Sequence, residues 1–158
     1  MTLAVIGNKE YALLGRLLYK RNRQAAVELL SDFHNSYIIP REKDLTHLPS
    51  FLAQFCEHYG VETSSFIATK HKREVVQNKK VFIAAILSLY CPGALEDPEI
   101  IRQSKTGIVY GIGEVLCLDH SNISKMIHSA IHYMKVYDSF RQEVVEVTEK
   151  LFSHGKSA

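Results

Sequence analysis

Apolar residues recur at intervals of three and four positions along most of the chain, and this spacing predicts an all-α fold. The most apolar of the predicted helices runs from Asn78 to Tyr90, and the Cys-Pro-Gly sequence after it would end it. We expect this segment to be the central core helix. Further helices are predicted at 9–33, at 49–60, from 63, between 97 and 107, and from 139. The first can break at Gly15 or at 21–23, and 35–43 is expected to be a linker.

The segment from Ile112 to Ile131 has the pattern of a helix-turn-helix. Apolar residues at helical spacing flank a short turn: Ile112, Val115 and Leu116 before it, and Ile123, Met126, Ile127, Ala130 and Met134 after it. The second helix opens with polar side chains, which are Asp119, His120, Ser121, Asn122, Ser124 and Lys125. In such a motif the second helix enters the DNA major groove with its N-terminus first. These side chains would then face bases and phosphates, with Asp119 expected to cap the helix.

Basic residues are clustered, although the net charge is only +2. Within eleven residues, Lys70, Lys72, Arg73, Lys79 and Lys80 are opposed only by Glu74. A second cluster comprises Arg16, Lys20, Arg21 and Arg23. Clustered positive charge is typical of proteins that contact phosphates. The ordinary alternative for such runs is a solvated surface.

Length and cysteine usage indicate an ordinary globular protein. At 158 residues the chain can bury a core without disulfides or structural metals. Its three cysteines, Cys56, Cys91 and Cys117, lie too far apart for a zinc knuckle, and we expect them to be buried in a reducing compartment. The N-terminus lacks the pattern of a signal peptide and no run approaches a membrane span, so we expect a cytoplasmic protein without membrane contact.

Motifs for catalysis or cofactor binding are weak. His128 and His132 are four residues apart on one helical face, a spacing that could hold zinc, but no third ligand is evident nearby. Gly111 and Gly113 lack the third glycine of a dinucleotide loop, and the phosphate-cradling GxxxxGK[ST] sequence does not occur. We therefore expect no cofactor, no metal and no enzymatic activity.

From about Phe51 to Leu151, the order of predicted elements resembles the C-terminal DNA-binding domain of the bacterial chromosomal replication initiator DnaA. The similar stretches are FLAQFCEHYGVETSSFIATKHKREV, QNKKVFIAAILSLY and IGEVLCLDHSNI. The region from about Phe51 to Leu151 covers about two thirds of the chain. The resemblance implies a helical cluster of the Trp-repressor-like class in a bacterial protein that binds double-stranded DNA. The initiator's ATPase module is not expected, because its phosphate-binding loop is missing.

The resemblance also implies roles for matched residues. Arg73 corresponds to a basic-loop arginine that reaches into the minor groove, and Lys79 lies near the family's second basic position. Asp119 and His120 match an Asp-His pair at the start of the recognition helix. Ser121 and Asn122 occupy the two hydroxyl positions that follow.

Three features depart from the family pattern. Cys117-Leu118 replaces the family's Gly-Gly-Arg before the Asp-His pair, so the arginine that reads a guanine is missing. The stretch 93–106 is an insertion, and Lys125 replaces a histidine. Binding to the family's usual DNA box is therefore not implied, whereas binding to duplex DNA is.

We predict an N-terminal helical extension over 1–44 and a helix-turn-helix DNA-binding domain over 45–158. The expected function is sequence-specific binding of duplex DNA. The predicted contacts are Lys70, Lys72, Arg73, Lys79, His120, Ser121, Asn122, Ser124 and Lys125. The alternative is a protein-interaction module that keeps the helical fold and no longer reads DNA. Its protein partner would bind the N-terminal helices or the acidic C-terminal helix.

Overall fold

Every regular element in the described part of the chain is a helix, which confirms the predicted all-α class. The structure is a computed structural model that describes residues 8–33, 45–98 and 107–155. The chain divides into two units, Met1–Ser36 and Tyr37–Ala158. The linker predicted at 35–43 and the boundary predicted after residue 44 fall outside the described residues. No helix among those described is long and apolar enough to cross a membrane.

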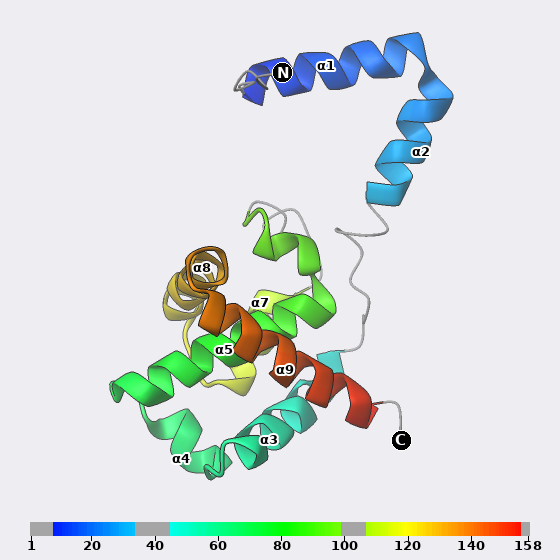
Figure 1. Ribbon diagram of the computed structural model, residues 1–158. Helices are drawn as coiled ribbons and strands as arrows, with labels where there is room; N and C mark the ends of the chain where they lie inside the picture. Colours follow the sequence, from blue (N-terminus) through cyan, green and yellow to red (C-terminus); the bar gives the residue numbers. More distant parts are fainter. Residues whose placement is uncertain (1–7, 34–44, 99–106, 156–158) are drawn as a thin grey trace. The chain divides into compact units, whose positions relative to one another are not determined.

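The first unit is a pair of helices, α1 (Asn8–Arg21) and α2 (Arg23–Phe33), drawn in blue in Figure 1. The chain breaks at Asn22, one of the two predicted places, and α1 continues through Gly15. The Asn22 side chain accepts a hydrogen bond from the backbone amide of Ala25 and thereby caps α2. Ala26 is buried. Large apolar side chains of both helices are exposed, namely Leu13, Leu17, Leu18, Val27 and Leu29.

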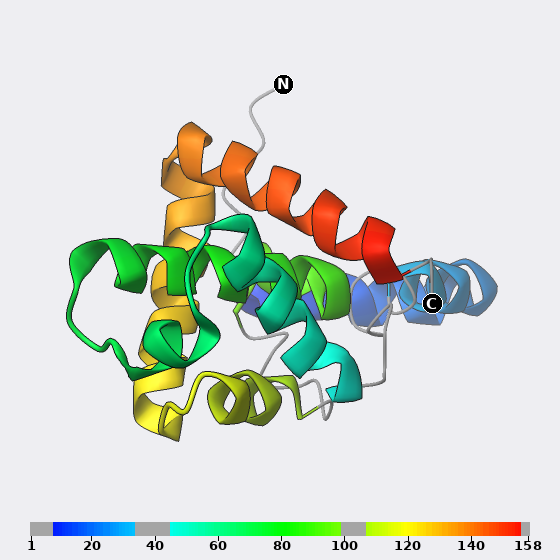
Figure 2. The ribbon, with the colours of Figure 1, turned by 90° about the horizontal axis from the view of Figure 1, so that it is seen from below.

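The second unit is built around α5 (Arg73–Tyr90), as predicted for the apolar core helix. All of its residues from 81 to 87 are buried. The helices α8 (His120–Val136) and α9 (Asp138–Gly155) pack against α5, and α7 (Ile108–Val115) packs against α8. Figures 1 and 2 show α7 and α9 on opposite sides of α5.

The remaining helices begin and end where local chemistry favours it. α3 (Leu48–His58) has Pro49 in its first turn, where a missing amide does no harm, and it follows a 3-10 turn at Leu45–His47. Gly60 adopts a φ of +63° just after α3, as expected for a C-terminal cap. α4 (Thr63–Ala68) starts at the predicted residue and buries Phe66. A 3-10 helix at Pro92–Leu95 follows α5.

α5 and α7 begin several residues earlier than predicted. α5 starts at Arg73 rather than Asn78, because Val75 packs against the core and extends the apolar stripe toward the N-terminus. The predicted basic loop is therefore largely helical. α7 starts at Ile108, because Ile108 and Ile112 lie one turn apart and are both buried. The short helix predicted between 97 and 107 lies mostly outside the described residues.

Candidate nucleic-acid interface

The first two turns of α8 present a polar surface to solvent. His120, Ser121, Asn122 and Lys125 are exposed, and Ser124 is half-buried. On the other side of the helix, four residues at helical spacing are buried: Ile123, Ile127, Ala130 and Ile131. The helix is thus fixed by its apolar stripe while its polar N-terminal residues are free to meet a ligand.

Asp119 caps this helix, as predicted from its residue type. One carboxylate oxygen accepts the backbone amide of Asn122 at 2.8 Å, and the other accepts the Asn122 side-chain amide at 2.6 Å. The hydrogen bond from the backbone amide holds the pKa of Asp119 below its ordinary value, so the carboxylate stays ionised at neutral pH. A side-chain amide carries two hydrogens and one acceptor oxygen. Asn122 therefore keeps one donor and its acceptor for another partner.

Gly113 allows the turn between α7 and α8 to be tight. The carbonyl of Gly113 accepts the amide of Leu118 at 2.8 Å. A Cβ at Gly113 would lie 3.2 Å from the backbone oxygen of Leu118, closer than side chains normally approach. Gly113 thus allows close packing within this turn. Cys117 adopts a φ of +51° in this turn.

The cysteines differ in their surroundings. Cys56 and Cys91 are buried, as expected, but the prediction for Cys117 is wrong because its side chain is exposed. The turn places Cys117 outside both apolar stripes. Burial raises the pKa of the Cys56 thiol, which keeps it protonated and unreactive at neutral pH.

Tyr110 adds an aromatic ring that the sequence pattern did not single out. Its side chain is 71 % exposed, and its ring centroid lies 5.3 Å from that of His120. The spacing of Ile108 and Ile112 could have indicated this position, because a helix that buries both of them turns Tyr110 toward solvent. An exposed aromatic pair therefore stands at the beginning of α8.

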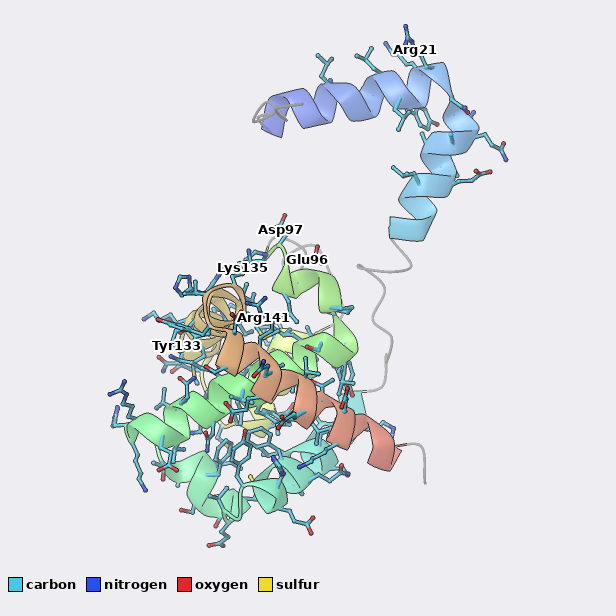
Figure 3. The ribbon with its side chains drawn as sticks, viewed as in Figure 1. Arg21, Glu96, Asp97, Tyr133, Lys135 and Arg141 are labelled. Atoms are coloured by element: carbon cyan, nitrogen blue, oxygen red, sulfur yellow. The ribbon has the colours of Figure 1, made fainter. Side chains whose placement is uncertain are left out.

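The whole of α8 carries positive and no negative charge. Beyond Lys125, its exposed residues include His128, His132 and Lys135. The Lys135 ammonium donates to the backbone oxygen of Glu96 at 2.8 Å, and Figure 3 shows the two residues near each other. Within the described ranges, no three histidine, cysteine or acidic side chains gather closely enough to hold a metal ion.

Lys79 is not a surface residue, so its predicted contact with DNA is wrong. Its side chain is 2 % exposed, and its ammonium donates to the carbonyl oxygens of Ile67 at 3.1 Å and Thr69 at 2.9 Å. The ammonium also lies 5.6 Å from the centroid of the Phe66 ring. Lys79 therefore satisfies backbone groups at the end of α4. Burial lowers the pKa of its ammonium.

The other predicted basic residues separate into two places. Lys70 and Lys72 are exposed on the segment between α4 and α5. Lys70 and Cys117 both affect the pKa of the Lys79 ammonium, which places Lys70 and the turn before α8 near this buried group. Arg73 instead lines a groove with Tyr133 and Tyr137 at the opposite end of α8.

No protein-family model, curated protein or solved structure matches the chain. The resemblance to the replication initiator thus rests on the residues of this sequence alone.

Proposed function

We propose that the protein binds duplex DNA in a sequence-specific manner, with the N-terminal turns of α8 in the major groove. The observation that carries this proposal is a buried and capped helix whose exposed first turns are polar and whose full length lacks acidic residues. The Trp-repressor-like and DnaA-like character expected from the sequence belongs to the same proposal. The tight turn from α7 and the packing against α5 support it, because recognition helices must be held rigidly.

Each exposed side chain has a defined contact in this proposal. Asn122 offers its remaining donor and its acceptor to the edge of an adenine, and Lys125 reaches a guanine or a phosphate. Ser121 and His120 form hydrogen bonds to phosphates or base edges. Ser124 lies at the edge of the proposed interface because it is half-buried. Lys70 and Lys72 contact the DNA backbone beside the turn, which fixes the register of α8 without reading sequence.

Fluorescence anisotropy with labelled duplexes tests the proposal. We expect binding to a pool of random duplexes at low salt and progressive loss as salt rises, because phosphate contacts release counterions. Lys125→Ala should weaken binding to every duplex. Arg141→Ala is the matched control, since it removes one positive charge from α9, which lies across α5 from α7, and it breaks an exposed ion pair with Asp138. Absence of binding at low salt, or equal effects of the two variants, would contradict the proposal.

A second candidate function is protein binding by the Met1–Ser36 unit. The exposed leucines of α1 and α2 favour it, because two short helices do not usually expose so much apolar surface without a partner. Replacing Leu13 and Leu17 with serine would distinguish the two candidate functions. Duplex binding should survive this change if α8 reads DNA, whereas a pure interaction module would bind no duplex in either form.

A further inference from the structure

A groove of about 820 Å³ lies between the N-terminal half of α5, the end of α8 and the start of α9. Its lining combines basic, polar and aromatic side chains, among them Arg73, Gln77, Lys80, Tyr133, Tyr137 and Phe140. In Figure 3, Tyr133 lies where the end of α8 meets the N-terminal half of α5. Asn122 and Tyr133 are eleven residues apart on α8, so about 16 Å of helix separates this groove from the proposed duplex site.

The aromatic rings form a braced platform. Tyr133 packs edge-on against Tyr137, with centroids 5.1 Å apart, and against Phe140, with centroids 5.5 Å apart. Phe140 is buried, Tyr133 is half-buried and Tyr137 is 49 % exposed. Phe140 thus braces Tyr133, and Tyr133 in turn braces Tyr137, whose exposed surface can accept a planar ligand group by stacking.

Two cations stand beside this platform. The Lys80 ammonium lies 4.2 Å from the centroid of the Tyr133 ring, and Arg73 is exposed at the first position of α5. Neither forms an ion pair with another described residue. Of the two carboxylates in the groove, Glu143 accepts the hydroxyl of Tyr59 and is held toward α3, while Glu74 lies in the first turn of α5. The cations are therefore available to an anionic ligand.

We propose that this groove binds an unstacked nucleotide, with its base on Tyr137 and its phosphate on Arg73 and Lys80. Stacking on an aromatic side chain next to basic residues is how proteins hold unpaired nucleotides. Glu74 and Gln77 supply acceptors for the amino group of a base such as cytosine. The ligand is either a free mononucleotide or a nucleotide within a single strand. This site is independent of the proposed duplex site, because neither Asn122 nor Lys125 lines the groove.

Anisotropy with a labelled hexamer of deoxycytidylate at low salt tests the proposal on the full chain. We expect the natural chain to bind, Tyr137→Ala to bind about tenfold more weakly, and Tyr137→Phe to restore most of the affinity because it keeps the ring. Arg73→Gln should weaken binding through loss of the phosphate contact. Tyr19→Ala is the matched control: Tyr19 is an exposed tyrosine with an arginine, Arg23, over its ring, and it lies outside the groove. It should leave the affinity unchanged.

Competition identifies the source of the nucleotide. Displacement of the hexamer by unlabelled deoxycytidine monophosphate indicates a mononucleotide site, and resistance to displacement, with the same variant effects, indicates a site for a single strand. The proposal is overturned if the hexamer does not bind, or if Tyr137→Ala and Arg73→Gln bind it like the natural chain. It is also overturned if a hexaglutamate peptide binds equally well and with the same dependence on Tyr137, which would indicate an acidic protein partner.

Discussion

Asp119 holds Asn122 with both of its carboxylate oxygens, one on the backbone amide and the other on the side-chain amide. The first bond caps α8, and the second fixes the direction of the Asn122 side chain. Because each of its carboxylate oxygens already accepts a hydrogen bond within the turn, Asp119 positions the neighbouring residue and does not itself need to meet a base.

Removing this carboxylate should therefore impair both the helix and the reading of DNA. We expect Asp119→Ala to lower the melting temperature and to reduce discrimination between duplexes, whereas Asp119→Asn should keep the cap. The folded-state pKa is lowered, so the stabilisation is complete above the ordinary value of 3.8 and is lost as the pH falls below it. Thermal unfolding at pH 7 and at pH 3 measures this difference. An Asp119→Ala variant that melts at the same temperature as the natural chain at pH 7 would show that this side chain does not act as a cap.

Asn122→Ala should relax sequence preference more than it weakens overall affinity. A bidentate contact to adenine contributes about 1–3 kcal/mol of discrimination at one base pair. Competition between a selected duplex and its single-base variants would measure this value. Unchanged discrimination in Asn122→Ala would remove this residue from the proposed contacts.

Lys79→Met should destabilise the fold by about 1–3 kcal/mol, because the carbonyls of Ile67 and Thr69 lose a buried donor. Burial lowers the pKa of the ammonium, so the unfolded chain binds more protons than the folded chain as the pH approaches the ordinary value of 10.5. The natural chain should then gain stability relative to the variant over that range. Chemical denaturation of the natural chain and the variant at pH 7 and at pH 10 checks both predictions. A stability difference between them that is the same at both pH values would contradict the second.

Gly113→Ala should be clearly destabilising, by about 1–3 kcal/mol, because the added Cβ meets the backbone oxygen of Leu118 and pushes the turn away from α7. Gly15→Ala is the matched control. It lies in the interior of α1 with open space around the new Cβ, and we expect it to be neutral or stabilising. Thermal melts of both variants would compare them, and similar values would show that the turn tolerates a side chain.

Tyr59→Phe should cost about 1 kcal/mol, because the Tyr59 hydroxyl donates to Glu143 and joins the end of α3 to α9. Burial, followed by the hydrogen bond to Glu143, raises the pKa of Tyr59 above its ordinary value of 10.0. At a pH between the ordinary pKa of 10.0 and the raised pKa of the folded state, the folded chain binds more protons than the unfolded chain. The free energy of unfolding should therefore fall as the pH rises above 10.0. The variant should lose less stability than the natural chain over that range. Denaturation at pH 9 and pH 11 would show this, and identical slopes would exclude the effect.

Much of the α8 surface could be predicted because it depends on local rules. Helical spacing separates Ile123 and Ile127 from the polar residues, and aspartate before a helix is a strong cap. The break at Asn22 and the role of α5 follow from similar patterns. These features depend only on residues that are close together in the sequence.

Features that depend on distant contacts could not be predicted in the same way. Lys79 belongs to a basic run, and only the position of α4 shows that its ammonium is buried. The groove joins Arg73 to Tyr137, which are far apart in sequence and meet only because α8 crosses α5. Spacing within one helix carries no information about such a crossing.

The central claim, that α8 reads duplex DNA with its first turns, is tested most directly by amide chemical-shift mapping. Adding a selected duplex to labelled protein should shift the resonances of Asp119 to Lys125 and of Lys70 to Lys72, and should leave the exposed residues of α9 unchanged. Shifts confined to α9 or to the Met1–Ser36 unit, or no shifts at all at low salt, would contradict it.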